Sequence, residues 1–284
     1  MASVADYLRL VRFSHTLFAL PFALGSFALA CRGLDTFPWS TLGWVLGAMV
    51  GMRSAAMGFN RWVDAGIDAR NPRTASREIP RGAITRTQAL VFVAVSSALF
   101  FLSAKAINTL AFQLSPIAYV VALGYSLCKR FTSLAHAVLG LALAIAPVGA
   151  WIAVRGRIEE PPLWMALIVL LWTTGFDIIY ATMDAEFDRR EGLHSIPAKL
   201  GIPASLIWAQ GLHLLMGLSW LALVLRADLG VWGVASMVLA VILVALEHRM
   251  VRPGDPGRMN LVFFKINAVV SVLFMTGAIL ESCS

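Results

Sequence analysis

The sequence predicts an all-α polytopic membrane protein with about nine transmembrane helices. Of the 284 residues, 59% are hydrophobic and only 14% are charged, and the mean hydropathy of +0.77 indicates a chain that lies mostly in a bilayer. A spanning helix needs roughly 20 apolar residues. Because such stretches fill the chain, we expect one domain, residues 1–284. The stretches lie near residues 13–31, 39–60, 88–106, 108–127, 134–154, 161–182, 203–225, 229–247 and 260–280.

The basic residues follow membrane topology. A net charge of +7 is compatible with nucleic-acid binding, but the positions of the charges argue against it. If the N-terminus is cytoplasmic, the inner segments collect most of the arginines and lysines, including Arg61 to Arg86 and Arg189 to Lys199. This is the asymmetry of the positive-inside rule. We therefore expect a cytoplasmic N-terminus and an outer C-terminus.

Neither a cleavable signal peptide nor a cysteine-based site is expected. The first apolar run is longer than a signal core, so it should remain as the first helix. Cys31, Cys128 and Cys283 are scattered and lack CxxC spacing. This pattern supports neither a disulfide framework nor a zinc site.

A charged stretch, Asn60 to Gly82, follows the second apolar run. If the helix continues into it, Asn60, Asp64 and Asp68 fall at i, i+4 and i+8, and drift only about 80 degrees around the axis. Arg53 lies two turns earlier on the same face. Lipid cannot solvate ionisable groups, which therefore face a bundle interior or a wet cavity. The default prediction is a functional site.

The alternative is that these aspartates only pair with the arginines that follow them in a solvated surface loop. Those arginines are Arg61, Arg70, Arg73 and Arg77. This stretch alone supports both interpretations equally. Arg73 and Arg77 could also neutralise the outer oxygens of a diphosphate.

A second stretch, Asp177 to Gly201, favours the site. Asp184 and Asp188 are again four residues apart, and Asp177 precedes the first of them by about two turns. Two acidic helix ends, each followed by a basic loop, predict carboxylate clusters that hold divalent cations around a phosphorylated ligand. Hard oxygen donors favour Mg2+.

Other positions carry weaker signals. Tyr125 and Lys129 stand one turn apart and could face the same ligand phosphate, although an interfacial tyrosine with a snorkelling lysine is commoner. Glycines at spacing four in the second helix should allow close approach of another helix; they are Gly43, Gly47 and Gly51. Three histidines share no spacing with the acids, so we expect them to be satisfied or interfacial; they are His136, His213 and His248.

The motifs NRWVDAGID and DAEFD, with YSLCK between them and SIPAKLG after the second, resemble the UbiA superfamily of intramembrane aromatic prenyltransferases. The resemblance covers nearly the whole chain, and implies a single transmembrane prenyltransferase domain over residues 1–284. It further implies nine helices around a central cavity, two Asp-rich motifs that bind a polyprenyl diphosphate through Mg2+, and an opening to the bilayer for the isoprenoid tail.

The resemblance also implies roles for individual residues. The metal sites would be Asn60, Asp64 and Asp68, and Asp184 and Asp188. Diphosphate binding would fall to Arg73, Arg77, Tyr125 and Lys129, and acceptor binding to Arg53 and Asp177. The catalytic set would comprise Asp64, Asp68, Asp184, Asp188, Lys129 and Asp177. The second motif departs from the pattern, since Gly192 follows in place of a longer acidic string.

The expected reaction is Mg2+-dependent transfer of a polyprenyl group to the ring of a hydroxylated aromatic acid. HTLFALPFALG and EFDRREGLHSIPAKLG resemble both the 4-hydroxybenzoate branch of ubiquinone biosynthesis and the dihydroxynaphthoate branch of menaquinone biosynthesis. A haem, chlorophyll or lipid acceptor is a further alternative. Arg53 favours an acidic aromatic acceptor over these three. The acceptor, the isoprenoid chain length and the oligomeric state stay open.

A cation or solute transporter is the alternative from another class, because acidic repeats on discontinuous helices also build transport sites. Such sites tend to lie near the bilayer midplane, whereas these acids cluster at cytoplasmic helix ends. We expect a multi-pass protein of a bacterial-type inner membrane with its active site open to the cytoplasm. Its partners would be the two substrates and the bilayer, with neither nucleic acid nor an obligate protein partner.

Overall fold

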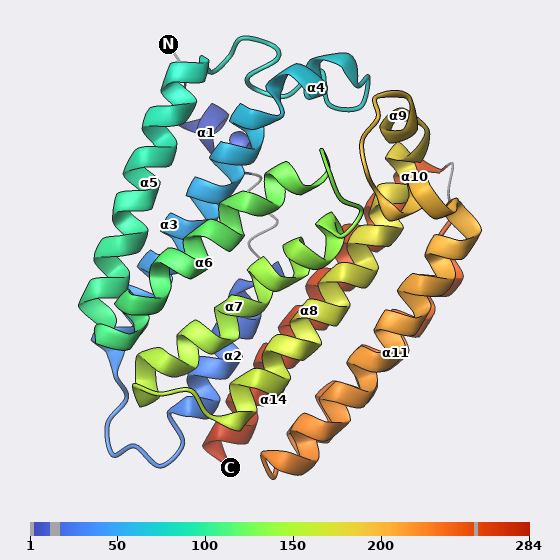
Figure 1. The fold of residues 1–284 in the computed structure, drawn as a ribbon. Coiled ribbons are helices and arrows are strands. Elements are labelled where there is room, and N and C mark those ends of the chain that lie inside the picture. Colours follow the sequence, from blue (N-terminus) through green and yellow to red (C-terminus); the bar gives the residue numbers. More distant parts are fainter. Residues whose placement is uncertain (1–2, 12–17, 253–254) are drawn as a thin grey trace. The chain divides into compact units, whose positions relative to one another are not determined.

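The computed structural model describes residues 3–11, 18–252 and 255–284. Helices account for the secondary structure of these residues, which include no strand (Figure 1). The expected first span, 13–31, begins within residues 12–17, which lie outside the described part. The chain divides into two compact units. The first unit contains residues 1–16 and 40–127, and the second contains residues 17–39 and 128–284.

Eight helices among the described residues are long and apolar enough to cross a membrane, which confirms the predicted all-α polytopic class. They include α3 (Trp39–Val63), α5 (Arg86–Ile107), α6 (Thr109–Cys128), α7 (Ala135–Arg155), α11 (Ile202–Arg226) and α12 (Val231–Met250). The other two spans are compound. One joins α8 (Glu160–Ala181) through a 3-10 turn (Thr182–Asp184) to α9 (Ala185–Arg190), and one runs from α13 (Pro256–Leu261) through a π-helical segment (Val262–Ile266) into α14 (Asn267–Cys283).

Four short helices complete the part of the chain that the structure describes. The apolar helix α2 (Leu20–Ala30) lies within the first expected span. Three others lie outside the long spans: α1 (Val4–Leu10), α4 (Ala65–Arg70) and α10 (Ile196–Leu200).

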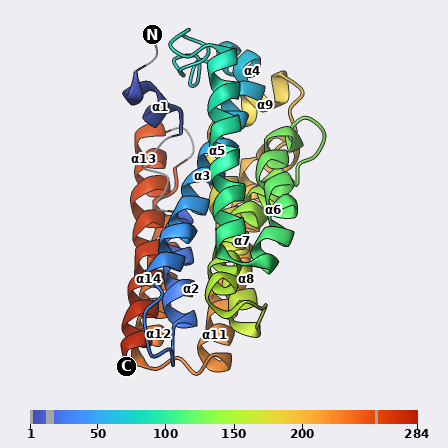
Figure 2. The ribbon, with the colours of Figure 1, turned by 90° about the vertical axis from the view of Figure 1, so that its left-hand side faces the viewer.

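In the first unit, α3, α5 and α6 run side by side (Figures 1 and 2). Close packing of α3 on α5 depends on glycine. A Cβ atom added at Gly51 would lie 2.7 Å from the backbone nitrogen of Phe100, and one at Gly47 would lie 2.8 Å from Ser103 Oγ. A Cβ atom at Gly43 would meet nothing within 4 Å. The predicted glycine contact is therefore confirmed at Gly47 and Gly51 and is wrong at Gly43.

The N-terminal helix α1 is tied to the loop that follows α4. Arg81 Nη2 donates to Asp6 Oδ1 over 3.0 Å, and Leu10 of α1 packs with Ile84 and Ala89 in one buried cluster. Hydrogen bonds from Ser3, and secondarily from Arg9, hold the pKa of the Asp6 carboxyl below its ordinary value. The loop between α4 and α5 is thus fixed at its distal end.

In the second unit, helices pack in the closed order α2, α7, α8, α11, α12, α14 and back to α2. Aromatic side chains fill the interior of this ring. Phe22 contacts Phe274 and Trp172 with ring centroids 4.6 Å and 5.2 Å apart, and Trp220 contacts Phe274 at 5.4 Å. All four side chains are buried. This apolar core holds the helices that carry the second acidic stretch.

Two sets of buried polar groups in this unit form hydrogen bonds within it. Glu281, at the end of α14, accepts from the backbone nitrogens of Gly230 and Gly233 over 2.7 Å and 2.9 Å, and so satisfies free donors at the start of α12. His213 donates from Nε2 to the carbonyl oxygen of Trp172 over 3.2 Å, and its Nδ1 lies 2.8 Å from His248 Nε2. The expectation of satisfied histidines is confirmed for this pair.

We predict that Gly51→Ala lowers the free energy of unfolding by about 1 to 3 kcal/mol, because the added methyl group meets backbone atoms of α5 that cannot move aside. Gly43→Ala is the matched control in the same helix. It should be neutral or slightly stabilising, because alanine is intrinsically the better helix former. Unfolding in detergent measures both, and equal stability of the two variants would contradict the packing account.

Candidate functional site

The first acidic stretch has a backbone junction at Asp64. Helix α3 ends at Val63 and α4 begins at Ala65, while Asp64 itself has φ −90° and ψ 2°, in a sparsely populated region where active-site residues often lie. Hydrogen bonds from Asp64 N to Asn60 O (3.0 Å) and from Asp68 N to Asp64 O (2.8 Å) continue across the junction. The predicted i, i+4, i+8 register is kept despite the break.

The side chain of Asp64 is oriented by its neighbours on α3. Asn60 Nδ2 donates to Asp64 Oδ2 over 3.0 Å, and Arg61 Nη1 donates to Asn60 Oδ1 over 3.3 Å. Arg61 is buried, while Asn60 and Asp64 are partly exposed. The Asn60 amide therefore links the buried guanidinium of Arg61 to the carboxylate of Asp64, which a ligand can reach.

Asp68 forms a buried ion pair with Arg77. The Arg77 Nη1 atom lies 2.6 Å from Asp68 Oδ1 and 2.8 Å from Oδ2, and the two side chains are 18% and 7% exposed respectively. Thr74 Oγ1 donates to the backbone oxygen of Asp68 over 3.1 Å and holds the loop against α4. The pairing expected in the surface-loop interpretation therefore exists for Arg77, in a buried setting that fixes the guanidinium beside the acidic stretch.

The remaining residues predicted in the first unit differ in their surroundings. Arg53 Nη2 donates to the carbonyl oxygen of Val11 over 3.3 Å. Arg53 and Asp64 both lie near enough to Tyr125 to act electrostatically on its phenol. Arg73 is exposed, and its backbone nitrogen donates to Asn71 Oδ1 over 2.9 Å.

The second acidic stretch repeats the backbone of the first. Helix α8 ends at Ala181, a 3-10 turn follows, and Asp184, at φ −107° and ψ 3°, precedes α9. These angles nearly match those of Asp64. The carboxylates of Asp184 and Asp188 are both buried. Each stretch therefore places its first aspartate at a helix junction and its second one turn into a short helix.

The carboxylate of Asp188 is suited to a cation. Its Oδ2 atom is buried and has no hydrogen-bond partner among the described residues, a costly state for a polar atom. Lys129 and Asp184 act on it electrostatically, and the Ser195 side chain lies near it. A hard cation would satisfy the unpaired oxygen. In the first unit, by contrast, a cation would share the Asp68 oxygens with Arg77.

Preassembled metal ligation is not seen in the described part of the chain, where no three His, Cys, Asp or Glu side chains already form a possible metal-binding group. Asn60, Asp64 and Asp68 lie in the first unit, and Asp184 and Asp188 in the second. Their amide and carboxylate oxygens are the donor type that Mg2+ requires. Tyr125 belongs to the first unit and Lys129 to the second.

A histidine contact was missed by the sequence interpretation. His136 Nδ1 lies 2.6 Å from Asp177 Oδ2, although the two residues are far apart in the chain. They lie at similar distances from the loop that joins α7 to α8, and an antiparallel pair of helices places such residues at one level. That register is the signal that would have found the contact.

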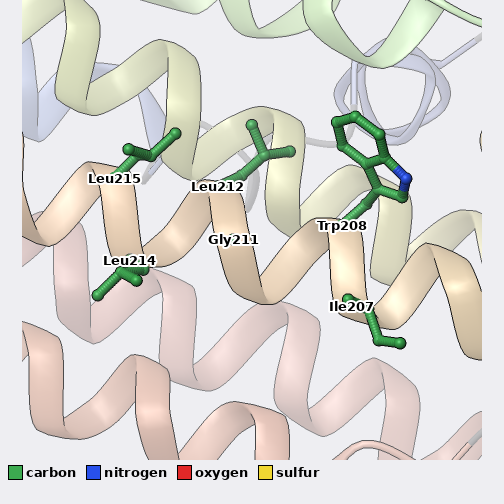
Figure 3. Close-up of a pocket in the computed structure, with 6 residues that line it drawn as sticks. All are labelled: Ile207, Trp208, Gly211, Leu212, Leu214 and Leu215. Atoms are coloured by element: carbon green, nitrogen blue, oxygen red, sulfur yellow. The ribbon is translucent and has the colours of Figure 1, made fainter.

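An apolar groove on α11 is separate from all of these residues. It is lined by Ile207, Trp208, Gly211, Leu212, Leu214 and Leu215 (Figure 3). Ile207 and Leu214 are largely exposed. Because the lining carries no charged group, the groove suits contact with lipid hydrocarbon and lacks the means to bind a phosphate.

Fold and site together define a polytopic membrane protein with two repeated acidic helix junctions. Residues 19–269 match the UbiA prenyltransferase family, and the chain belongs to that family. It is a prenyltransferase, which confirms the family resemblance and sets the transporter alternative aside.

Named relatives and solved structures agree with this membership. The chain is 30% identical to the 4-hydroxybenzoate octaprenyltransferase of Nitrosomonas europaea, over 89% of this chain and 86% of the relative. It is 33% identical to that of Xanthomonas euvesicatoria, over 87% and 81%. The apo structure of a UbiA homolog from Aeropyrum pernix K1 is similar with a TM-score of 0.85 and 34% identity, covering 94% of this chain and 98% of that one.

A UbiA homolog from Archaeoglobus fulgidus bound to GPP and Mg2+ shares the fold, with a TM-score of 0.72 and 20% identity, over 98% of this chain and 100% of the other.

We predict that Arg77→Gln lowers the free energy of unfolding by about 2 to 3 kcal/mol, because Asp68 would remain buried without its counter-charge. Adding Asp68→Asn should recover part of this loss. Unfolding in detergent without metal measures the effect.

Arg81→Gln is the control for this prediction, since it breaks the more exposed pair with Asp6 and should cost about 0 to 1 kcal/mol. Equal losses in the Arg77 and Arg81 variants would contradict a stabilising role for the buried pair.

Proposed function

We propose that residues 1–284 act as one domain that transfers a polyprenyl group from a polyprenyl diphosphate to the ring of a hydroxylated aromatic acid, with Mg2+ as cofactor. The observation that carries the proposal is the repeated acidic helix junction, at Asp64 and at Asp184, with a buried unpaired carboxylate oxygen on Asp188. The names of the relatives favour 4-hydroxybenzoate over dihydroxynaphthoate as the acceptor.

The acidic residues would hold the cofactor and the donor. Asp64 and Asp68 in one unit, and Asp184 and Asp188 in the other, would ligate Mg2+, with Asn60 adding an amide oxygen. When bound, Mg2+ would neutralise charge that develops on the leaving diphosphate. The homolog of known structure bound to GPP and Mg2+ supports the choice of Mg2+ and an allylic diphosphate as ligands.

Basic residues and a phenol would bind the diphosphate itself. Lys129 supplies a point charge, Tyr125 a hydroxyl donor, and Arg73 and Arg77 guanidinium donors. Such donors stabilise the charge that builds up as the allylic carbon–oxygen bond breaks. Arg77 is already fixed by Asp68, so little reorganisation is needed when the substrate binds.

The acceptor would be oriented by Arg53 and Asp177. Arg53 can hold a carboxylate with two parallel hydrogen bonds. Asp177, whose side chain is 20% exposed, would orient or accept the phenolic proton. In the reaction the allylic carbon bonds to a ring carbon, the diphosphate departs with the electron pair, and the ring carbon loses its proton. The aspartates of the two acidic stretches would hold the donor through Mg2+ while Arg53 and Asp177 align the ring.

Membrane embedding follows from the chemistry of the donor. An isoprenoid tail is itself a lipid, while the acceptor is water-soluble and would arrive from the cytoplasm. The distribution of arginine and lysine supports a cytoplasmic position for both acidic stretches, in what we propose is a bacterial-type inner membrane.

Purified protein with Mg2+, geranyl diphosphate and 4-hydroxybenzoate should form a prenylated acid. Asp188→Asn should lower kcat/KM about 100-fold or more, because a buried charge facing the leaving group is lost. Glu186→Gln, an exposed acid on the same short helix that pairs with Arg190, is the matched control and should retain activity.

Three outcomes would count against parts of the proposal. Product that forms equally with EDTA would exclude the metal role. Donor binding without product from either 4-hydroxybenzoate or dihydroxynaphthoate would exclude the acceptor class, and equal activity of the Asp188 and Glu186 variants would exclude the assignment of the second acidic stretch.

A further inference from the structure

The imidazole of His136 connects two parts of the second unit. On one side its Nδ1 lies 2.6 Å from Asp177 Oδ2 on α8. On the other side its Nε2 lies 3.3 Å from the backbone nitrogen of Ile196, the first residue of α10 within the second acidic stretch. His136 itself lies on α7, so one side chain joins three segments.

The hydrogen-bond pattern assigns the direction of each contact. A backbone N–H can only donate, so Nε2 of His136 must accept from Ile196. The proton of a neutral imidazole is then on Nδ1, which donates to the carboxylate of Asp177. This bond restricts the rotation of Asp177 and leaves its other oxygen, Oδ1, for a ligand.

Exposure separates the roles of the two residues. The side chain of His136 is fully buried, whereas that of Asp177 is 20% exposed. A ligand can therefore reach Asp177 and cannot reach His136. His136 can influence the acceptor only through the carboxylate that it holds.

The Ile196 contact extends the connection to the donor-binding residues. The backbone nitrogen of His194 donates to the carbonyl oxygen of Lys129 over 2.7 Å, and the backbone nitrogen of Leu193 donates to the carbonyl oxygen of Asp188 over 2.8 Å. Residues 193, 194 and 196 thus contact Asp188, Lys129 and His136 respectively. The segment 193–196 therefore links the predicted donor-binding residues to the histidine that holds the predicted acceptor-binding residue.

We propose that His136 is a positioning residue for the aromatic acceptor: it fixes the carboxylate of Asp177, and the segment 193–196 fixes His136 relative to Lys129 and Asp188. The inference rests on the proposed function, because Asp177 is assigned to the acceptor there. It adds a residue that the sequence motifs do not contain.

Two substitutions separate the contacts of His136. The amide nitrogen of asparagine falls close to the place of Nδ1, so His136→Asn keeps a donor to Asp177. The longer glutamine reaches toward the place of Nε2, so His136→Gln keeps the contact with Ile196 and loses the one with Asp177. We expect His136→Gln to raise the KM for 4-hydroxybenzoate about 10-fold with the KM for geranyl diphosphate unchanged, and His136→Asn to stay within about 3-fold of wild type for both.

Two controls distinguish positioning from a general structural role. His213→Asn alters another buried histidine of the second unit, which contacts His248 and Trp172 and neither Asp177 nor Asp188. This substitution should lower the melting temperature without changing the KM for the donor or for the acceptor. In an Asp177→Asn background, His136→Gln should change the acceptor KM by less than about 2-fold, because the group it positions is already altered.

Several results would overturn the inference. One is a parallel rise of donor and acceptor KM in His136→Gln, and another is an undiminished effect of His136→Gln in the Asp177→Asn background. If His136→Gln does not fold, an acceptor KM for His136→Asn as high as that of Asp177→Asn overturns it. Absence of product from the wild-type protein with any of the acids would instead overturn the proposed function, and the inference with it.

Discussion

Lipid cannot solvate a charge, so this prenyltransferase must give each buried acidic side chain a partner inside the protein or a bound ligand. The rest of the structure depends on that requirement. Asp68 is neutralised by Arg77 inside the first unit, and Asp177 is held by a buried histidine in the second. Asp188 differs, because one oxygen stays without a hydrogen-bond partner among the described residues. A buried polar atom left unsatisfied is costly, so its retention is best explained by a ligand that carries positive charge.

The scaffold of each unit serves to hold these groups. In the first unit, Gly51 on α3 lies against backbone atoms of α5, and this close packing fixes the helix that ends at the first acidic junction. In the second unit, interlocked aromatic rings fix α8, the helix that carries Asp177 and leads to Asp184. Both aspartates at the junctions have nearly the same unusual backbone angles. Rigid helices that end in a short irregular turn can aim a carboxylate and still leave it open to a ligand.

Much of this was predictable from the sequence because membrane helices and charge spacing are local signals. Helical period and hydropathy predicted the eight long spans among the described residues and the register of Asn60, Asp64 and Asp68. The absence of any contact at Gly43 was not predictable, since the spacing does not reveal where the partner helix diverges. The contact between His136 and Asp177 depends on the pairing of α7 with α8, which is a tertiary property. The residue roles themselves stay predictions, because their assignment rests on motif resemblance and chemistry.

The central claim is that the acidic residues of both units bind divalent metal together with the diphosphate of the donor. Electron paramagnetic resonance of Mn2+, used in place of Mg2+, measures this directly in purified protein with and without geranyl diphosphate. The account predicts metal binding that strengthens when the diphosphate is added and that weakens in both Asp64→Ala and Asp188→Asn, while Glu186→Gln behaves as wild type. Metal binding that is unchanged in both aspartate variants, or indifferent to the diphosphate, would contradict it.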